Sequence, residues 1–250
     1  ERTEKIQRMQ SKLLRSEKLA SVGELVAGIA HEINNPLTGV LMFATMLEED
    51  SRLDPNLKSD LGTIVHETQR CAKIVRELLD FSRESVPQKK IESINLLLDK
   101  TMSLVEHHTS FHDIVVVKEY DPKLPKILID PSQIEQVFMN ILINASQAMP
   151  TSGRLTIQTG VMEQENVLYA RVTDTGMGIS EENLQKIFDP FFSTKGNAGT
   201  GLGLSVSYGI IENHGGTIEV ASPPGGGTSF TIKLPIVVNG DAAQEPATTT

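Results

Sequence analysis

Five short motifs hold the residues of this chain that could do chemistry. In chain order they are His31-Glu32-Ile33-Asn34-Asn35-Pro36, Asn140-x-x-x-Asn144, Asp174-Thr175-Gly176-Met177-Gly178, Phe188-Asp189-Pro190-Phe191-Phe192 and Gly199-Thr200-Gly201-Leu202-Gly203. The first pairs an imidazole with a carboxylate, and the second offers two amides. The remaining three supply a carboxylate, aromatic rings and two glycine-rich turns. The five in this order predict a phosphate acceptor at one end and an ATP site at the other.

The histidine motif predicts a nucleophile on a helix. His31 lies two positions from Ile29 and from Ile33, so it points outward if those isoleucines face a helical core. An exposed imidazole is mostly neutral at pH 7, which leaves one ring nitrogen nucleophilic. Glu32 can hold the proton on the other ring nitrogen. Pro36 should bend the helix just below the acceptor, and a surface histidine beside a proline kink is the alternative interpretation.

The asparagine pair is suited to a metal ion. Asn140 and Asn144 are one helical turn apart, so both amides lie on one face of a helix. Amide oxygens are suitable ligands for Mg²⁺, which prefers oxygen. Without the other motifs, the same pair could be two ordinary hydrogen-bonded helix amides.

The first glycine turn predicts recognition of adenine. Asp174 follows a strand, and its carboxylate could accept a hydrogen bond from the exocyclic amino group of adenine. Guanine has a carbonyl at that position and would be repelled. Gly176 and Gly178 permit backbone conformations with positive φ and a close approach to the base. A plain turn at a strand end is the alternative.

The second glycine turn predicts a phosphate site. Gly199, Gly201 and Gly203 precede an apolar helix, whose free N–H groups could bind phosphate. The twenty residues between Gly178 and Gly199 are predicted to form a mobile lid. Phe188 could anchor this lid or pack in the core, and Lys195 could reach a phosphate or remain solvated.

The pattern of apolar residues in the N-terminal part of the chain predicts an antiparallel helical hairpin. Residues 1–50 form a helical pattern that a polar segment, 48–55, interrupts before a second helix. The apolar residues recur at steps of three and four, and include Leu19, Val22, Val26, Ile29, Ile33, Leu37, Val40, Ala44 and Leu47, then Leu57, Leu61, Ile64, Thr68, Cys71, Val75 and Leu78. A lone hairpin cannot cover this stripe, so two copies are expected to form a four-helix bundle. Cys71 is expected to be a core thiol.

The rest of the chain predicts an α/β sandwich. A polar linker at 85–90 precedes residues 91–236, where helix and strand patterns alternate. Helices are expected at 95–108, 131–149 and 202–213, and strands at 114–119, 126–129, 154–160, 167–173, 216–221 and 228–234. Residues 237–250 are predicted to be a disordered tail.

The motifs together resemble the sensor histidine kinases of two-component signalling. His31-Glu32-Ile33-x-Asn35-Pro36-Leu37 looks like the H box, and the other four look like the N, G1, F and G2 boxes, over roughly residues 15–235. The resemblance implies a dimerisation and phosphotransfer hairpin at 1–84, and an ATP-binding domain of the GHKL (Bergerat) type at 91–236. It implies a homodimer through residues 15–80 and a response regulator receiver domain as partner.

The resemblance also assigns residues. His31 would be the phosphoacceptor, and Glu32 would orient and assist its imidazole ring. Asn35 would position water to dephosphorylate the regulator. Nucleotide-binding residues would be Asn140, Asn144, Asp174, Gly176, Gly178, Phe188, Lys195, Gly199, Gly201, Leu202, Gly203 and Thr228, with both asparagines also on Mg²⁺. Gln147 stands where many members carry Lys, which leaves one phosphate contact open.

The expected function is transfer of the γ-phosphoryl group of ATP to His31 and then to an aspartate of a response regulator. The ATPases that share this nucleotide fold (the Hsp90, gyrase and MutL group) carry Glu where Asn140 stands. Asn cannot act as a general base, which disfavours hydrolysis of ATP. A GHKL-type ATPase and a catalytically silent dimeric scaffold remain the alternatives.

Composition sets the outer limits. The net charge of −9 argues against non-specific nucleic-acid binding. The single cysteine permits no internal disulfide, which suits a reducing cytosol. No apolar run is long enough to span a bilayer, so no membrane contact is expected within this fragment. The chain begins without Met in mid-helix, so we expect a cytoplasmic piece of a longer protein that an N-terminal sensor region could anchor in a membrane.

Overall fold

The computed structural model describes residues 33–50, 53–82, 87–106, 109–194 and 199–236. The chain divides into two compact units, Glu1–Ser85 and Val86–Thr250, which are described separately. No helix in the described ranges is long and apolar enough to cross a membrane.

The described part of the first unit is a helical hairpin. Residues 33–48 are helical, and α2 covers Pro55–Ser82. The carboxylate of Asp54 accepts a hydrogen bond from the N–H of Asn56 at 2.8 Å, and Pro55 begins α2 where its missing N–H costs nothing. The side chain of Glu48 lies against Gly62, so the two helices run side by side in opposite directions. This confirms the predicted hairpin and its break at 48–55.

The hairpin buries little of its apolar stripe. Ala44, Thr68 and Val75 are buried, whereas many of the large apolar residues are exposed. These are Ile33, Val40, Met42, Phe43, Met46, Leu47, Leu57 and Ile64. Cys71 is also exposed, so the prediction of a core thiol is wrong for a single chain. One hairpin offers too few facing side chains to cover a stripe of this width.

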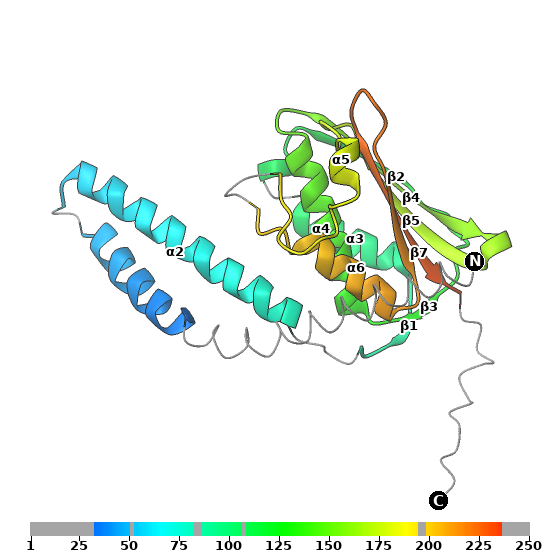
Figure 1. The fold of residues 1–250 in the computed structure, drawn as a ribbon, viewed down its shortest axis with the longest axis horizontal. Coiled ribbons are helices and arrows are strands. Elements are labelled where there is room, and N and C mark those ends of the chain that lie inside the picture. The colour runs from blue at the N-terminus through cyan, green and yellow to red at the C-terminus, as the bar shows by residue number, and fades with distance from the viewer. Residues whose placement is uncertain (1–32, 51–52, 83–86, 107–108, 195–198, 237–250) are drawn as a thin grey trace, which may run out of the picture. The chain divides into compact units, whose positions relative to one another are not determined.

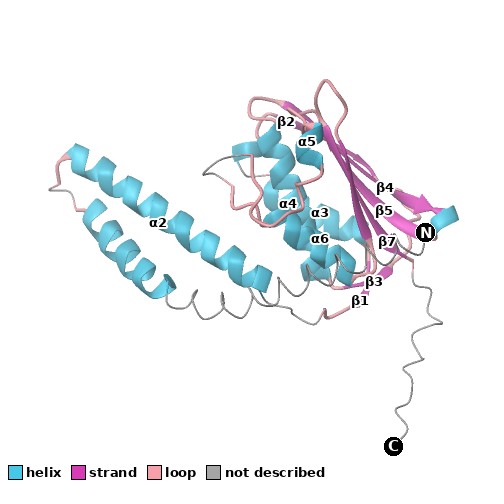
Figure 2. Ribbon diagram, viewed as in Figure 1, coloured by secondary structure: helices cyan, strands magenta, loops and turns pink. Residues whose placement is uncertain are grey.

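The second unit is a two-layer α/β sandwich, as predicted. Figures 1 and 2 show helices covering one face of a twisted sheet. The main sheet has the order β2-β4-β5-β7-β6, in which only β2 and β4 are parallel. Its strands are β2 (Ile114–Glu119), β4 (Gly153–Met162), β5 (Val167–Asp174), β6 (Thr217–Ala221) and β7 (Thr228–Pro235).

The three predicted helices of this unit lie close to their predicted ranges, and α5 (Glu181–Leu184) is a short helix that was not predicted. The predicted helices are α3 (Ile94–Val105), α4 (Pro131–Ala148) and α6 (Gly203–Asn213), with single 3₁₀ turns at Thr109–Phe111 and Glu163–Glu165. Apolar side chains of α3, α4 and α6 meet the inner face of the sheet to form the core. Phe138 and Ile134 of α4 are completely buried there.

A small second sheet was not predicted in full. β1 (Lys90–Glu92) pairs antiparallel with β3 (Ile127–Ile129), and Ile91 lies opposite Leu128. β1 begins at Lys90, the last residue of the predicted linker. β1 has only three residues, of which only Ile91 is apolar, so the sequence shows no strand periodicity there. The strand forms because its distant partner β3 pairs with it.

The alternation of β5 positions its last residue. Leu168, Ala170 and Val172 point into the core, and period two places Asp174 on the same inner face. A carboxylate therefore ends a buried apolar row and faces the helical layer rather than solvent.

Candidate functional site

Asp174 is a buried and oriented carboxylate. Only 4% of its surface is exposed. Its Oδ1 atom accepts hydrogen bonds from the N–H of Gly176 at 2.8 Å and from the N–H of Thr228 at 3.2 Å. Burial raises the pKa of Asp174, and the hydrogen bonds from Gly176 and Thr228 partly oppose that rise. Within the described residues both bonds engage Oδ1, which leaves Oδ2 to accept a hydrogen bond from a ligand.

The first glycine turn is attached to the end of α4. The N–H of Met177 donates to the carbonyl of Ala148 at 3.1 Å. A Cβ on Gly176 would lie 2.5 Å from that same carbonyl oxygen, so only glycine fits. The helix that carries Asn140 and Asn144 is therefore joined directly to the turn that carries Asp174.

The hairpin turn between β6 and β7 supports the same glycine turn. The N–H of Gly227 donates to the carbonyl of Gly176 at 2.7 Å. Ser222 Oγ accepts from the N–H of Ile179 at 2.8 Å and donates to the carbonyl of Gly227 at 2.7 Å. Gly178, with φ of 77°, approaches Ser222 closely. Sequence reasoning missed Ser222 and Gly227, because the run Gly225–Gly227 shows only that a turn is present.

Asn140 joins α4 to the start of α6. Its Nδ2 atom donates to the carbonyl of Gly203 at 3.0 Å and to Ser207 Oγ at 3.2 Å. Because the amide hydrogens are used in this way, Oδ1 is the atom that could face a metal. Asn144 is half-buried one turn further along α4. This donor set of amide oxygens fits Mg²⁺.

The second glycine turn pairs with the aromatic motif. Gly201 has φ of 68°, and its carbonyl accepts from the N–H of Phe191 at 3.1 Å. The ring of Phe188 lies 5.4 Å from the ring of Tyr208 on α6, at an interplanar angle of 48°. The aromatic motif therefore holds the loop next to α6, and Leu202 is buried immediately before α6 begins.

Some predicted site residues lie outside the described residues. These are His31, Glu32 and Lys195. Asn35 is described and is exposed on the helix at 33–48.

A hollow of about 560 Å³ lies over β5, β6 and β7. Asp174, Gly227 and Thr228 line it, together with Thr173 and Ser229. Asn140, Asn144 and Gly203 do not line this hollow. The asparagines are instead linked to the turn of Asp174 through α4, because the carbonyl of Ala148 at the end of α4 accepts a hydrogen bond from the N–H of Met177.

Comparisons with known proteins place both units in families. Residues 129–238 match the family described as histidine kinase-, DNA gyrase B-, and HSP90-like ATPase. Residues 21–85 match the His Kinase A (phospho-acceptor) domain. The solved catalytic domain of the histidine kinase ThkA is 32% identical, with a TM-score of 0.54, over 59% of this chain and 95% of that chain.

The chain belongs to the sensor histidine kinases of two-component signalling.

Curated sensor histidine kinases match most of this chain. The signal transduction histidine-protein kinase AtoS of Escherichia coli K12 is 39% identical over 93% of this chain and 38% of its own length. The sensory histidine kinase/phosphatase NtrB of Vibrio alginolyticus is 41% identical over 85% of this chain and 62% of its own length. The chain thus spans less than two thirds of either relative.

A longer solved histidine kinase shares both units. ThkA, solved in complex with the response regulator protein TrrA, is 31% identical with a TM-score of 0.66, over 92% of this chain and 66% of that chain. ThkA and this chain therefore share the same order of units, a helical hairpin followed by an α/β sandwich.

Proposed function

We propose that this chain is the catalytic core of its sensor histidine kinase, and that it transfers the γ-phosphoryl group of ATP to His31. The phosphoryl group then passes to an aspartate of a response regulator receiver domain. The observation that carries the proposal is Asp174, a buried carboxylate whose Oδ1 is fixed by Gly176 and Thr228. ThkA and its regulator supply the precedent for the partner. We propose a cytoplasmic location for this core, because ATP and such a regulator would be available to it there.

The nucleotide would lie between α4, α6 and the first glycine turn. Asp174 Oδ2 would accept a hydrogen bond from the adenine amino group, between Gly176, Gly178 and Thr228. Gly199, Gly201, Leu202 and Gly203 would offer backbone N–H groups to the phosphates at the start of α6. Phe188 holds this loop by its contact with Tyr208, and Lys195 would pair with a phosphate.

The two asparagines suit phosphoryl transfer better than hydrolysis. Oδ1 of Asn140 and the amide of Asn144 would hold Mg²⁺, which when bound neutralises phosphate charge. Neither amide can remove a proton from water, because an amide is not a base. Since Asn140 already donates to Gly203 and Ser207, its remaining polar atom is an acceptor.

In the transfer itself, a ring nitrogen of His31 forms a bond to the γ-phosphorus. The bond from that phosphorus to the bridging oxygen breaks, and ADP leaves with the electron pair. The ring's other nitrogen must then lose its proton, and Glu32 is the adjacent carboxylate that could take it. The chain therefore needs positioning and charge neutralisation rather than a strong base.

Residues 1–84 would form the dimerisation and phosphotransfer domain, and residues 91–236 the ATP-binding domain. A homodimer through residues 15–80 is supported by the exposed apolar stripe of the hairpin. Asn35, exposed on the same helix, would position water for dephosphorylation of the regulator, an activity that the name of NtrB gives to that relative.

Incubation with ATP labelled at the γ-phosphate tests the proposal. We expect acid-labile label on the protein and none on His31→Gln. Released phosphate without labelled protein would instead show an ATPase, and neither product would show a silent scaffold. Addition of the regulator to labelled protein should move the label to that regulator.

A further inference from the structure

His214 makes two hydrogen bonds at the end of α6. It is 5% exposed. Its Nδ1 atom lies 2.7 Å from the carbonyl of Ile210, and its Nε2 atom lies 2.9 Å from the backbone N of Asp130. A carbonyl can only accept, so Nδ1 carries the proton. Nε2 must then accept the N–H of Asp130, and both bonds together require the neutral ring.

This bond is a polar connection between α4 and α6. Asn140 makes another, through its bonds to the carbonyl of Gly203 and to Ser207 Oγ. Asp130 lies at the start of α4 and His214 at the end of α6, so the two helices run antiparallel. The connections are ten residues apart on α4 and eleven on α6, which corresponds to about 15 and 16.5 Å at 1.5 Å per residue.

Two connections at these spacings fix the register of the helix pair. Between them, Val137 of α4 and Ile211 of α6 are buried in the same apolar core. Apolar contacts are not directional and tolerate sliding better than hydrogen bonds do. The connection at His214 therefore constrains where Asn140 and Gly203 meet.

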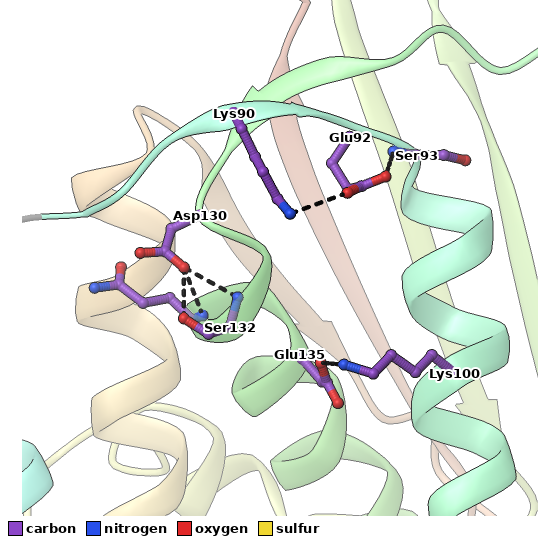
Figure 3. Close-up of polar contacts among 8 residues, drawn as sticks. Lys90, Glu92, Ser93, Lys100, Asp130, Ser132 and Glu135 are labelled. Atoms are coloured by element: carbon purple, nitrogen blue, oxygen red, sulfur yellow. Dashed lines mark hydrogen bonds and ion pairs between the residues drawn. The ribbon is translucent and has the colours of Figure 1, made fainter.

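The chain enters this unit at the same place. The N–H of Gln88 donates to Asp130 Oδ2 at 2.8 Å, and Lys89 Nζ donates to the carbonyl of Asn213 at 3.0 Å. Asp130 Oδ1 accepts from the N–H of Ser132 at 3.0 Å and from its hydroxyl at 2.6 Å, as Figure 3 shows. The residues that follow the helical hairpin are thus attached to the ends of both site helices.

The charged groups that face His214 are Lys89 and Asp130. Burial lowers the pKa of His214 below its ordinary value of 6.5, and Lys89 lowers it further, while the bond to Ile210 and the charge of Asp130 oppose this. Burial alone would raise the pKa of Asp130, but its bonds from Ser132, Gln88 and Gln133 outweigh burial and lower it. Asp130 therefore stays charged when His214 takes up a proton.

We propose that His214 is a positioning residue of the nucleotide site, and that it holds α6 in register on α4 through a bond that only its neutral ring can accept. This inference rests on the proposed function, because it concerns the same nucleotide. A protonated ring would turn an N–H toward the N–H of Asp130. The helix pair would then lose the connection that aligns Asn140 with Gly203, and nucleotide affinity would fall with it.

The test compares the pH dependence of Mg·ATP affinity in two chains. His214→Gln places an amide oxygen that does not titrate near the position of Nε2. Because the pKa of His214 is lowered, its protonation falls below the ordinary range of histidine. Between about pH 7.5 and about pH 5 we therefore expect the wild type to lose affinity more than His214→Gln does, by up to about five-fold, the size of one lost hydrogen bond. ATP itself titrates in this range, and the comparison at equal pH removes that contribution.

Two further chains complete the design. His214→Leu removes the acceptor and should bind about five-fold more weakly than the wild type even at pH 7.5. His112→Gln, at an exposed histidine, should follow the wild type at every pH. If His214→Leu does not fold, the comparison with His214→Gln alone decides.

The outcomes separate the two proposals. Parallel pH profiles for the wild type and His214→Gln would overturn the positioning role while leaving the proposed function intact. A wild type that binds no Mg·ATP at pH 7.5 would overturn the proposed function itself. Thermal unfolding at each pH identifies the folded fraction, so that a loss of stability is not counted as a loss of affinity.

Discussion

The two units differ in how much of their apolar surface they bury. The hairpin leaves large side chains such as Phe43, Met46 and Leu57 exposed, whereas the α/β unit buries Phe138 and Leu98 completely. A unit that covers its own core can fold alone, but a single two-helix hairpin needs another surface. Under the proposed function, the phosphoacceptor His31 belongs to the unit that leaves its apolar residues exposed, and we expect the structure of that unit to depend on association.

The largest expected effect separates the chemistry of the two units. His31→Gln should abolish autophosphorylation completely, because the nucleophilic nitrogen is lost. The affinity for ATP should stay nearly unchanged, because the proposed nucleotide-binding residues belong to the other unit. Labelling and nucleotide titration of the same preparation check this. Stable label on His31→Gln, or a large fall in its ATP affinity, would contradict the division of roles.

The next effect tests the difference in burial. Phe138→Ala should lower the free energy of unfolding of the α/β unit by about 3–5 kcal/mol, because it leaves a cavity in a closed core. Ile64→Glu, on the exposed stripe, should instead shift the hairpin from dimer to monomer and leave that unfolding free energy nearly unchanged. Unfolding and sedimentation, each measured over a range of protein concentrations, distinguish the two. Concentration-independent behaviour of the wild type would argue against the dimer.

A smaller effect concerns recognition within the α/β unit. Asp174→Asn can keep the two hydrogen bonds to Oδ1 but replaces Oδ2 with an amide that opposes the adenine amino group. The loss should be about 1–3 kcal/mol of binding free energy for ATP. Isothermal titration checks it, with Asp113→Asn on the exposed surface as the control. Equal ATP affinity in Asp174→Asn and the wild type would rule out this carboxylate as the adenine acceptor.

The smallest effect concerns a surface ion pair. Lys100 Nζ of α3 lies 2.7 Å from Glu135 Oε2 of α4, as Figure 3 shows. Because the lysine is 63% exposed, Lys100→Gln should cost less than about 1 kcal/mol of unfolding free energy. A denaturant titration next to Phe138→Ala gives the contrast. A cost comparable to that of Phe138→Ala would mean that charge rather than burial holds α3 on α4.

Local patterns predicted the elements that bury their own apolar faces. Residues Pro131–Ala148 form α4 within one residue of the expected range, since Asp130 and Pro131 signal the start and apolar periodicity signals the length. β5 ends at Asp174, one residue beyond the expected strand. Features that depend on distant partners could not be read in this way. β1 forms because it pairs with β3. Ser222 supports the first glycine turn because its Oγ accepts a hydrogen bond from the N–H of Ile179.

The site residues show the same limit. Asp174 and Asn140 were predicted as ligand groups from their types and spacing, and these roles stay predictions until binding is measured. Their protein partners, Thr228 N–H and the carbonyl of Gly203, come from segments 54 and 63 residues away along the chain. No local pattern reports a backbone group at that separation, so the sequence indicates which side chains matter but not what holds them.

The position of β7 in the sheet has a consequence for the order in which the molecule is made. β7 lies between β5 and β6, and its first residue, Thr228, supplies one of the two hydrogen bonds that orient Asp174. A chain emerging from the ribosome has completed β5 and both site helices well before it contains β7. Its carboxylate remains incompletely held until the last strand inserts. Competence to bind the proposed nucleotide would thus be acquired only once β7 has been made, and a chain truncated before β7 would keep every other motif residue yet lack a finished pocket.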